Sequence, residues 1–212
     1  MFRMCKTVVA LMLVTVSTLA SAAGDIGLVD RLSGEVKVKS GNGSTFAATA
    51  FMKVREGDIF TLPAGSEAQI VFFDGRRREL WRGPAAVKAT AARGEAISGT
   101  PASVSETKGV PNRTVLANAG NVQRLGSMIM REVSSRWPDE KAIAQAHADY
   151  LKWVASTEPD DILPELSMIG LLRQRDEPGL MAPYLEALQR KQPDRPEVKA
   201  LIEEYGKPSG KR

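Results

Sequence analysis

The chain of 212 residues is long enough for one large domain or two small ones. Its apolar content of 43% is ordinary for a soluble protein, so packing alone can supply a core. A formal charge of +4 and a single cysteine, Cys5, exclude a strongly charged chain and a fold built on disulfides.

The first 23 residues have the pattern of a secretory signal. Arg3 and Lys6 precede an apolar run over 8–19, and small residues follow over 20–23. A membrane span needs about 20 apolar residues; this run is shorter, so we expect a cleaved signal peptide rather than a retained anchor. The mature chain would have no cysteine, no integral membrane span and a formal charge of +2, because two basic residues leave with the signal. This predicts a periplasmic protein, or as the weaker option a secreted one, that does not bind nucleic acid.

Residues 26–98 are predicted to be rich in β-strands, because glycines fall between short apolar runs. Over 26–39, valines alternate with charged residues, as in a half-buried strand pair. The clearest strand covers 67–73, where Ile70 lies on one face and Val71 on the other. Both faces of this strand are therefore expected to be covered.

The turn after this strand is open to more than one interpretation. Asp74-Gly75 is a strong signal for a tight hairpin. A two-residue hairpin would, however, set Ile70 opposite Glu79, which suits a buried face poorly. We therefore favour a step of the chain to a new layer of a coil-like β-stack, with a bulge at the turn as the other option.

A series of turn residues runs through this region in a characteristic order. The series consists of Gly34, Gly57, Asp58, Gly65, Asp74, Gly75 and Gly83. In the order and spacing of these turns, residues 26–98 resemble the FecR domain. The resemblance implies a small twisted β-solenoid outside the cytoplasmic membrane, which in iron-uptake regulators receives a signal from an outer-membrane receptor and controls a sigma factor. Because neither a cytoplasmic anti-sigma segment nor a spanning helix precedes the domain, we expect a shared scaffold and location without that regulatory output.

A change of period separates the β region from a helical region. Residues 99–120 are rich in Ala, Gly, Ser, Thr and Pro and are expected to form a connector, with Ile97 and Val104 as candidates for one last weak strand. Over 121–206, apolar residues three or four apart predict about five helices. The predicted fold class is therefore α+β, with a small β-solenoid-like or β-sandwich-like domain over 24–98 and a helical region after it.

A faint repeat links two of the predicted helices. Tyr150 recurs as Tyr184, each followed by a leucine, at an offset of 34 residues. This offset equals the period of tetratricopeptide repeats, whose units are helical hairpins, so the region is faintly similar to that family. We expect Leu151 to join an apolar stripe and Asp160 to cap a helix. The basic tail over 207–212 is expected to be disordered.

No set of residues predicts catalysis or metal binding. His147 is the only histidine, and we expect it to be packed within a helical stripe, since a lone histidine without a cysteine partner does not make a metal site. Neighbouring carboxylates such as Asp160 and Asp161 fit helix ends better than the opposed acids of a glycosidase. A hydrolase would need His147 beside an acid and a hydroxyl. We therefore expect a protein that is not an enzyme and has no cofactor.

The most polar feature of the β region is a cluster made up of Arg76, Arg77, Arg78, Trp81 and Arg82. One interpretation is a solvated strand edge, whose charges discourage aggregation. The other is an anion-binding patch, because guanidinium groups match phosphate and carboxylate and stack on aromatic rings. We favour the solvated edge, since runs of charge usually face water.

Together these features predict an exported FecR-like scaffold that binds a protein partner or senses a signal in the cell envelope. The signal peptide and the ordered turns support this hypothesis, and the 34-residue offset adds a helical surface for binding. The alternative is a binder of envelope glycan or lipid phosphate through the cluster over 76–82.

Overall fold

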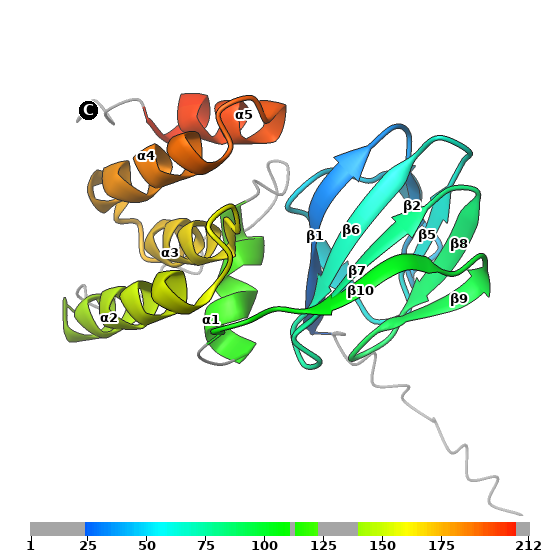
Figure 1. Cartoon of the computed structure of the whole chain (residues 1–212), viewed down its shortest axis with the longest axis horizontal. Coiled ribbons are helices and arrows are strands. Elements are labelled where there is room, and N and C mark those ends of the chain that lie inside the picture. Colours follow the sequence, from blue (N-terminus) through cyan, green and yellow to red (C-terminus); the bar gives the residue numbers. More distant parts are fainter. Residues whose placement is uncertain (1–23, 111–112, 123–139, 207–212) are drawn as a thin grey trace, which may run out of the picture.

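The structure is a computed structural model that describes residues 24–110, 113–122 and 140–206. A β part comes first and a helical part follows, which confirms the predicted α+β class (Figure 1). The expected signal peptide, most of the helix expected from residue 121 and the basic tail lie outside the described residues.

The β part has ten strands within the described ranges. They are β1 (Asp25–Ser33), β2 (Lys37–Lys39), β3 (Thr45–Ala47), β4 (Lys53–Arg55), β5 (Ile59–Leu62), β6 (Glu67–Phe72), β7 (Arg77–Arg82), β8 (Ala85–Ala89), β9 (Gly94–Ser98) and β10 (Pro101–Glu106). Sheet A has the strand order β10-β7-β6-β1-β4, and sheet B has the order β3-β2-β5-β8-β9. Neighbouring strands pair antiparallel throughout both sheets.

The two sheets pack face to face around an apolar core. Side chains of a strand alternate between its two faces, so Phe60 and Leu62 of β5 both point toward sheet A. Other side chains that fill this core are those of Val38, Ile70, Trp81 and Val87. The β part is therefore a sandwich, which is one of the two architectures expected from the sequence.

Strands β6 and β7 form the hairpin that the sequence analysis disfavours. Ile70 pairs with Glu79 in the register of a tight hairpin, and residues 73–76 form its loop. The prediction of a step to a new layer is therefore wrong. The hairpin can place Glu79 opposite Ile70 because the fully buried Glu79 carboxylate has hydrogen-bond partners. Its Oε2 accepts hydrogen bonds from Trp81 Nε1 at 2.9 Å and from the Gly94 backbone N–H at 3.1 Å. A satisfied carboxylate is tolerated opposite an apolar residue.

The helical part has five α-helices within the described ranges; four of them lie in the region where the sequence predicts helices, and the first lies in the predicted connector. They are α1 (Arg113–Asn118), α2 (Glu140–Ser156), α3 (Leu163–Gln174), α4 (Ala182–Lys191) and α5 (Pro196–Tyr205), with the short 3-10 helices η1 (Ala119–Val122) and η2 (Pro178–Leu180). In the parts of the chain that the structure describes, none of the helices has the length and apolar character needed to cross a bilayer.

The expected connector over 99–120 is instead structured. It contains β10, which pairs with β7 at the edge of sheet A, and α1, which packs against α3. Ile97 and Val104 lie on the separate strands β9 and β10 rather than on one last strand. Weakly apolar sequence is sufficient here because β10 adds to a preformed sheet and buries little of its own surface.

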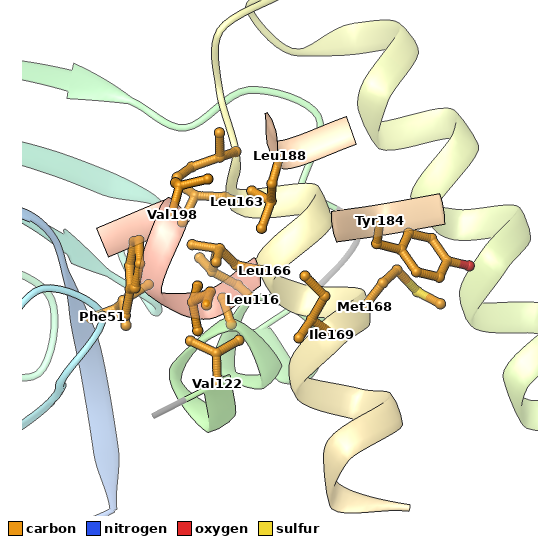
Figure 2. Close-up of a cluster of buried hydrophobic side chains, with 14 of the residues drawn as sticks. Phe51, Leu116, Val122, Leu163, Leu166, Met168, Ile169, Tyr184, Leu188 and Val198 are labelled. Atoms are coloured by element: carbon orange, nitrogen blue, oxygen red, sulfur yellow. The ribbon is translucent and has the colours of Figure 1, made fainter. Parts of the chain in front are cut away.

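The helices cover the outer face of sheet A, which confirms that both faces of β6 are covered. Val71 of β6 points away from the sandwich core and joins the apolar cluster of the helices. Helix α3 lies at the centre of that cluster, with residues 163–170 all buried. Figure 2 shows side chains of α3 converging with Phe51 from the β part and Leu116 from α1. The β part and the helical part therefore share one hydrophobic core at their junction.

Two details of the helices differ from the prediction. Leu151 is 54% exposed, whereas Trp153, two residues later on α2, is fully buried. Burying the large indole removes more apolar surface from water than burying a leucine does. At the start of α3, Asp161 Oδ1 rather than a group of Asp160 accepts the Leu163 N–H, at 3.1 Å.

Candidate functional site

The predicted arginine cluster is divided between the two faces of β7. Trp81 lies in the sandwich core, and Arg77 Nε donates to Oε1 of the buried Glu79 at 2.5 Å. Arg78 points to the opposite face, toward the helices, because successive side chains of a strand alternate. The indole ring is therefore not available to stack on a ligand beside the other arginines.

The two remaining arginines face solvent at the ends of the hairpin. Arg82 Nε lies 2.7 Å from Glu67 Oε1 across the hairpin, and 61% of the Arg82 side chain is exposed. Arg76 is exposed in the loop, with a φ of 46°. The five residues of the cluster therefore do not form one surface patch.

Each predicted turn residue lies in a connection between consecutive strands. Asp58 Oδ2 accepts the Arg55 N–H at 2.9 Å and closes the turn before β5. A Cβ atom at Gly83 would lie 1.7 Å from the Pro63 carbonyl oxygen, so only glycine fits there. The other members are Gly34, Gly57 and Gly65, which have positive φ, and Asp74 and Gly75 at the tip of the hairpin. These residues shape the sandwich.

A group of charged side chains, which we call the junction cluster, connects sheet A to the helices. It consists of Asp30 on β1, Arg78 on β7, Asp161 before α3 and Arg195 before α5. Arg78 Nη2 donates to Asp161 Oδ1 at 2.9 Å, and Arg78 Nε lies 3.9 Å from Asp30 Oδ2. Arg195 Nη1 lies 3.7 Å from Asp30 Oδ1, and Arg195 Nη2 donates to the Asp30 backbone carbonyl. Two aspartates and two arginines from distant parts of the chain thus meet at the junction.

A second buried ion pair lies within the helices, next to this cluster. Lys191 Nζ donates to Glu165 Oε2 at 3.0 Å and to the Asp161 backbone carbonyl at 2.8 Å. The Tyr150 hydroxyl donates to Glu165 Oε1 at 3.1 Å. Burial raises the pKa of Tyr150, and the adjacent Glu165 carboxylate raises that pKa further. The phenol therefore stays protonated and acts as a hydrogen-bond donor.

His147 does not have the packed position expected for it. It is exposed on α2, its ring stacks on Tyr150 with the centroids 5.9 Å apart, and its Nδ1 lies 2.8 Å from the Tyr184 hydroxyl. Burial raises the pKa of Tyr184, so this hydroxyl is a weak candidate for a nucleophile. The surroundings of His147 therefore do not resemble a hydrolase triad.

A polar pocket of about 160 Å³, which we call the junction pocket, opens between sheet A and the helical part. Its wall consists of Asp30, Arg31, Gln69, Arg78, Asp160, Asp161, Ile162, Gln192 and Arg195. The pocket is smaller than the roughly 300–1,000 Å³ that drug-sized ligands occupy. Among the residues described, no three His, Cys, Asp or Glu side chains are grouped as metal ligands.

Asp30 is a buried acid of this wall, with 8% of its side chain exposed. Burial raises the pKa of Asp30, and the guanidinium groups of Arg78 and Arg195 oppose that rise. Asp30 Oδ1 and Arg78 Nε are both buried without a hydrogen-bond partner. The ion-pair distances of 3.7 and 3.9 Å around Asp30 are too long for hydrogen bonds. Other protein atoms cover both of them, so these two atoms lie beneath the pocket wall and are not exposed in the pocket.

Two edges of the sandwich are open for strand pairing. In the described part of the chain, β9 pairs only with β8, and β10 pairs only with β7. The two edge strands follow one another in the chain and belong to different sheets. Ile97 of β9 is 59% exposed and Val104 of β10 is 45% exposed.

The junction cluster is the feature that reasoning from the sequence misses. Asp30 is followed by a second charged residue, Arg31, and therefore looks like a solvent-facing residue of a half-buried strand. Arg195, whose guanidinium donates to Asp30, lies 165 residues away. No local pattern in the sequence connects positions so far apart.

Comparisons with known proteins identify no relative of this chain: no family model, no curated protein and no solved structure matches it. The likeness to FecR domains in the order of the turns therefore stays a prediction.

Proposed function

We propose that this protein is an exported, non-enzymatic scaffold of the cell envelope, which binds an extended segment of a partner protein along β10 and β9. The observation that carries the proposal is that β10 and β9 are free edge strands, β10 of sheet A and β9 of sheet B. An unpaired strand edge offers a row of backbone donors and acceptors, and a partner segment can add to it as a further strand.

The opposite edge strands of the two sheets, β3 and β4, are less suited to the addition of a partner strand than β9 and β10 are. Strands β3 and β4 have three residues each, and β4 carries Lys53 and Arg55, which both pair with Asp25. Short length and charge are common ways to protect a strand edge. Strands β9 and β10 have five and six residues, and each has one charged residue, Glu95 and Glu106. The β9–β10 side is therefore the one suited to strand addition.

The location in the envelope rests on the sequence. The signal pattern at the N-terminus supports export, and the resemblance of the turn series to FecR domains supports a periplasmic scaffold that receives a protein signal. No observation favours the alternative of glycan or lipid-phosphate binding through residues 76–82, because Trp81 is buried and Arg77 is paired with Glu79.

The proposal can be tested with a photo-crosslinking amino acid placed at position 104 of the full chain in cells. We expect one defined adduct with another protein, found in the envelope fraction, because the side chain at 104 is exposed on the free edge strand β10. The matched control is the same amino acid at Phe46, which is 44% exposed on the short edge strand β3 and is expected to give no such adduct.

Two outcomes would contradict the proposal. Equal adducts from positions 104 and 46, or none from either, would show that β10 is not a preferred docking edge. An adduct made only of two copies of this chain would replace the partner protein with self-association.

A further inference from the structure

We infer that the partner segment lies antiparallel along β10, with a lysine or arginine opposite Glu106 and an apolar residue opposite Val104. This inference rests on the proposed function, because it specifies the chemistry of the partner at the same strand. It is carried by the direction of the backbone groups of β10 and by the charge of Glu106 beside them.

The hydrogen bonds between β10 and β7 show which backbone groups of β10 point outward. Just beyond β10, the Thr107 N–H donates to the Arg76 carbonyl, in the same register as the two strands. In an antiparallel ladder, residues that bond to the neighbouring strand alternate with residues whose N–H and C=O point away from it. Ser105 therefore also bonds to β7, whereas the N–H and C=O of Val104 and Glu106 point to the free edge.

These outward groups are available to a further strand. In the part of the chain that the structure describes, β10 pairs only with β7, and no backbone hydrogen bond joins Val104 or Glu106 to another segment. An added strand can form hydrogen bonds at both residues. Because they lie two positions apart, these bonds also fix which partner residues stand opposite them.

The charge of Glu106 specifies one of these partner residues. Glu106 is exposed, and no described lysine or arginine forms an ion pair with it. Arg77, which stands opposite on β7, instead directs its Nε to Glu79 at 2.5 Å. A cation on the added strand would be one strand spacing, about 4.8 Å, from Glu106 and two spacings from Arg77. Since opposite charges on neighbouring strands stabilise the pair, this position favours a basic residue.

The exposed side chain of Val104 specifies the second partner residue. Val104 lies on the same face of β10 as Glu106, because residues two apart in a strand share a face. Its side chain is 45% exposed at the free edge of sheet A. An apolar residue opposite would remove that surface from water. Neighbouring strands of sheet A are antiparallel, so the basic residue comes two positions before the apolar one in the partner sequence.

Two labelled peptides test this order of residues. Each is a nonapeptide of threonine, which favours extended strands; the first has lysine at its fourth position and valine at its sixth, and the second has the two exchanged. Composition and charge are equal, so non-specific attraction does not distinguish the peptides. We expect the full chain to bind the first about fivefold more tightly in fluorescence anisotropy, as two matched cross-strand pairs allow.

A charge exchange tests the pair at Glu106. Glu106→Lys is expected to weaken binding of the first peptide about fivefold, because a like charge replaces an opposite one. A peptide with glutamate in place of its lysine is expected to bind Glu106→Lys more tightly than it binds the native chain. The matched control is Glu95→Lys, the same change on the edge strand β9, which is expected to leave binding of both peptides unchanged.

A proline tests the backbone contact. Val104→Pro removes an N–H that points to the free edge, a position where an edge strand tolerates proline. We expect binding of the first peptide to fall about tenfold, as for one lost hydrogen bond, while circular dichroism keeps its native value. Ser105→Pro provides the contrast, because it removes a hydrogen bond to β7 and is expected to lower the stability of the fold. If Val104→Pro folds poorly, the charge exchange at Glu106 decides.

Several results would overturn the inference. They are the absence of peptide binding, equal or tighter binding of the second peptide, no preference of Glu106→Lys for the glutamate peptide, and unchanged binding by a folded Val104→Pro variant. If any of these occurs while position 104 still gives a defined adduct in cells, the proposed function stands and only this partner chemistry is rejected. Absence of the adduct would reject the proposed function itself.

Discussion

At the scale of single residues, the buried carboxylates of this protein differ in how fully they are satisfied. The buried Glu79 on β7 accepts hydrogen bonds from Trp81, Gly94 and Arg77. Asp30, at the junction, has an oxygen without a hydrogen-bond partner. A buried carboxylate with several donors is tolerated within the fold, whereas a partly satisfied one costs stability.

We expect Glu79→Gln to lower the free energy of unfolding by about 1–3 kcal/mol, the cost of a buried donor left without a partner. The amide keeps the size of the carboxylate, but its nitrogen cannot accept from Trp81 Nε1 or from the Gly94 N–H. Urea unfolding, followed by circular dichroism, measures the change.

The control for this variant lies on the same hairpin. Glu67→Gln weakens an exposed pair with Arg82 and is expected to cost less than about 1 kcal/mol. Equal losses from the two variants would show that the hydrogen bonds of Glu79 contribute no more than a surface ion pair.

At the scale of elements, the central helix α3 depends on a close approach by the chain at the end of α1. A Cβ atom at Gly170 would lie 1.8 Å from the Asn118 carbonyl oxygen. That oxygen belongs to backbone, which cannot move aside as a flexible side chain can. Gly170 is therefore needed for packing, even though glycine is a poor helix former.

We expect Gly170→Ala to destabilise the protein by about 1–3 kcal/mol, as overpacking of a core does. This loss outweighs the gain of up to about 1 kcal/mol that alanine brings to a helix interior. Chemical denaturation measures the balance. A stabilised variant would mean that α1 shifts away from α3 at little cost.

Gly179 in η2 provides the matched control for that substitution. A Cβ atom there meets no other group within 4 Å. Gly179→Ala is therefore expected to change the stability by no more than about 0.5 kcal/mol.

At the scale of the whole molecule, sheet A is apolar on both of its faces. Its inner face belongs to the sandwich core, and Leu28, Val71 and Phe73 on the other side belong to the cluster of the helices. Without the helices, this second face would be exposed to water, which opposes independent folding of the sandwich. The two parts are therefore expected to unfold together.

Single-tryptophan variants can test this cooperativity, because Trp81 lies in the sandwich and Trp153 lies in α2. In a variant that keeps Trp81 alone, we expect the fluorescence and the helical circular dichroism to lose their native values at the same urea concentration, as in a two-state transition. The variant that keeps Trp153 alone should show the same coincidence. Separate midpoints in either variant would show that the sandwich and the helices unfold as independent units.

The features that the sequence predicts correctly are those set by local patterns. Alternation of apolar residues marks the strand at 67–73, and a three-to-four spacing marks helices such as α4 and α5. Turn residues such as Gly57 and Gly65 lie where their positive φ is needed. Each of these signals depends on neighbouring residues and on backbone geometry, so it can be read without knowing the fold.

The tertiary structure alone decides the register of the β6–β7 hairpin and the composition of the junction. The hairpin is acceptable because Gly94, from another sheet, hydrogen-bonds to Glu79. The junction pocket exists because Asp30, Arg78 and Arg195 come together from separate elements. The sequence by itself thus determined the α+β class and the order of the elements, since periodicity and turn chemistry are local. It could not determine the candidate site, because burial and long-range hydrogen bonds arise only when distant segments meet.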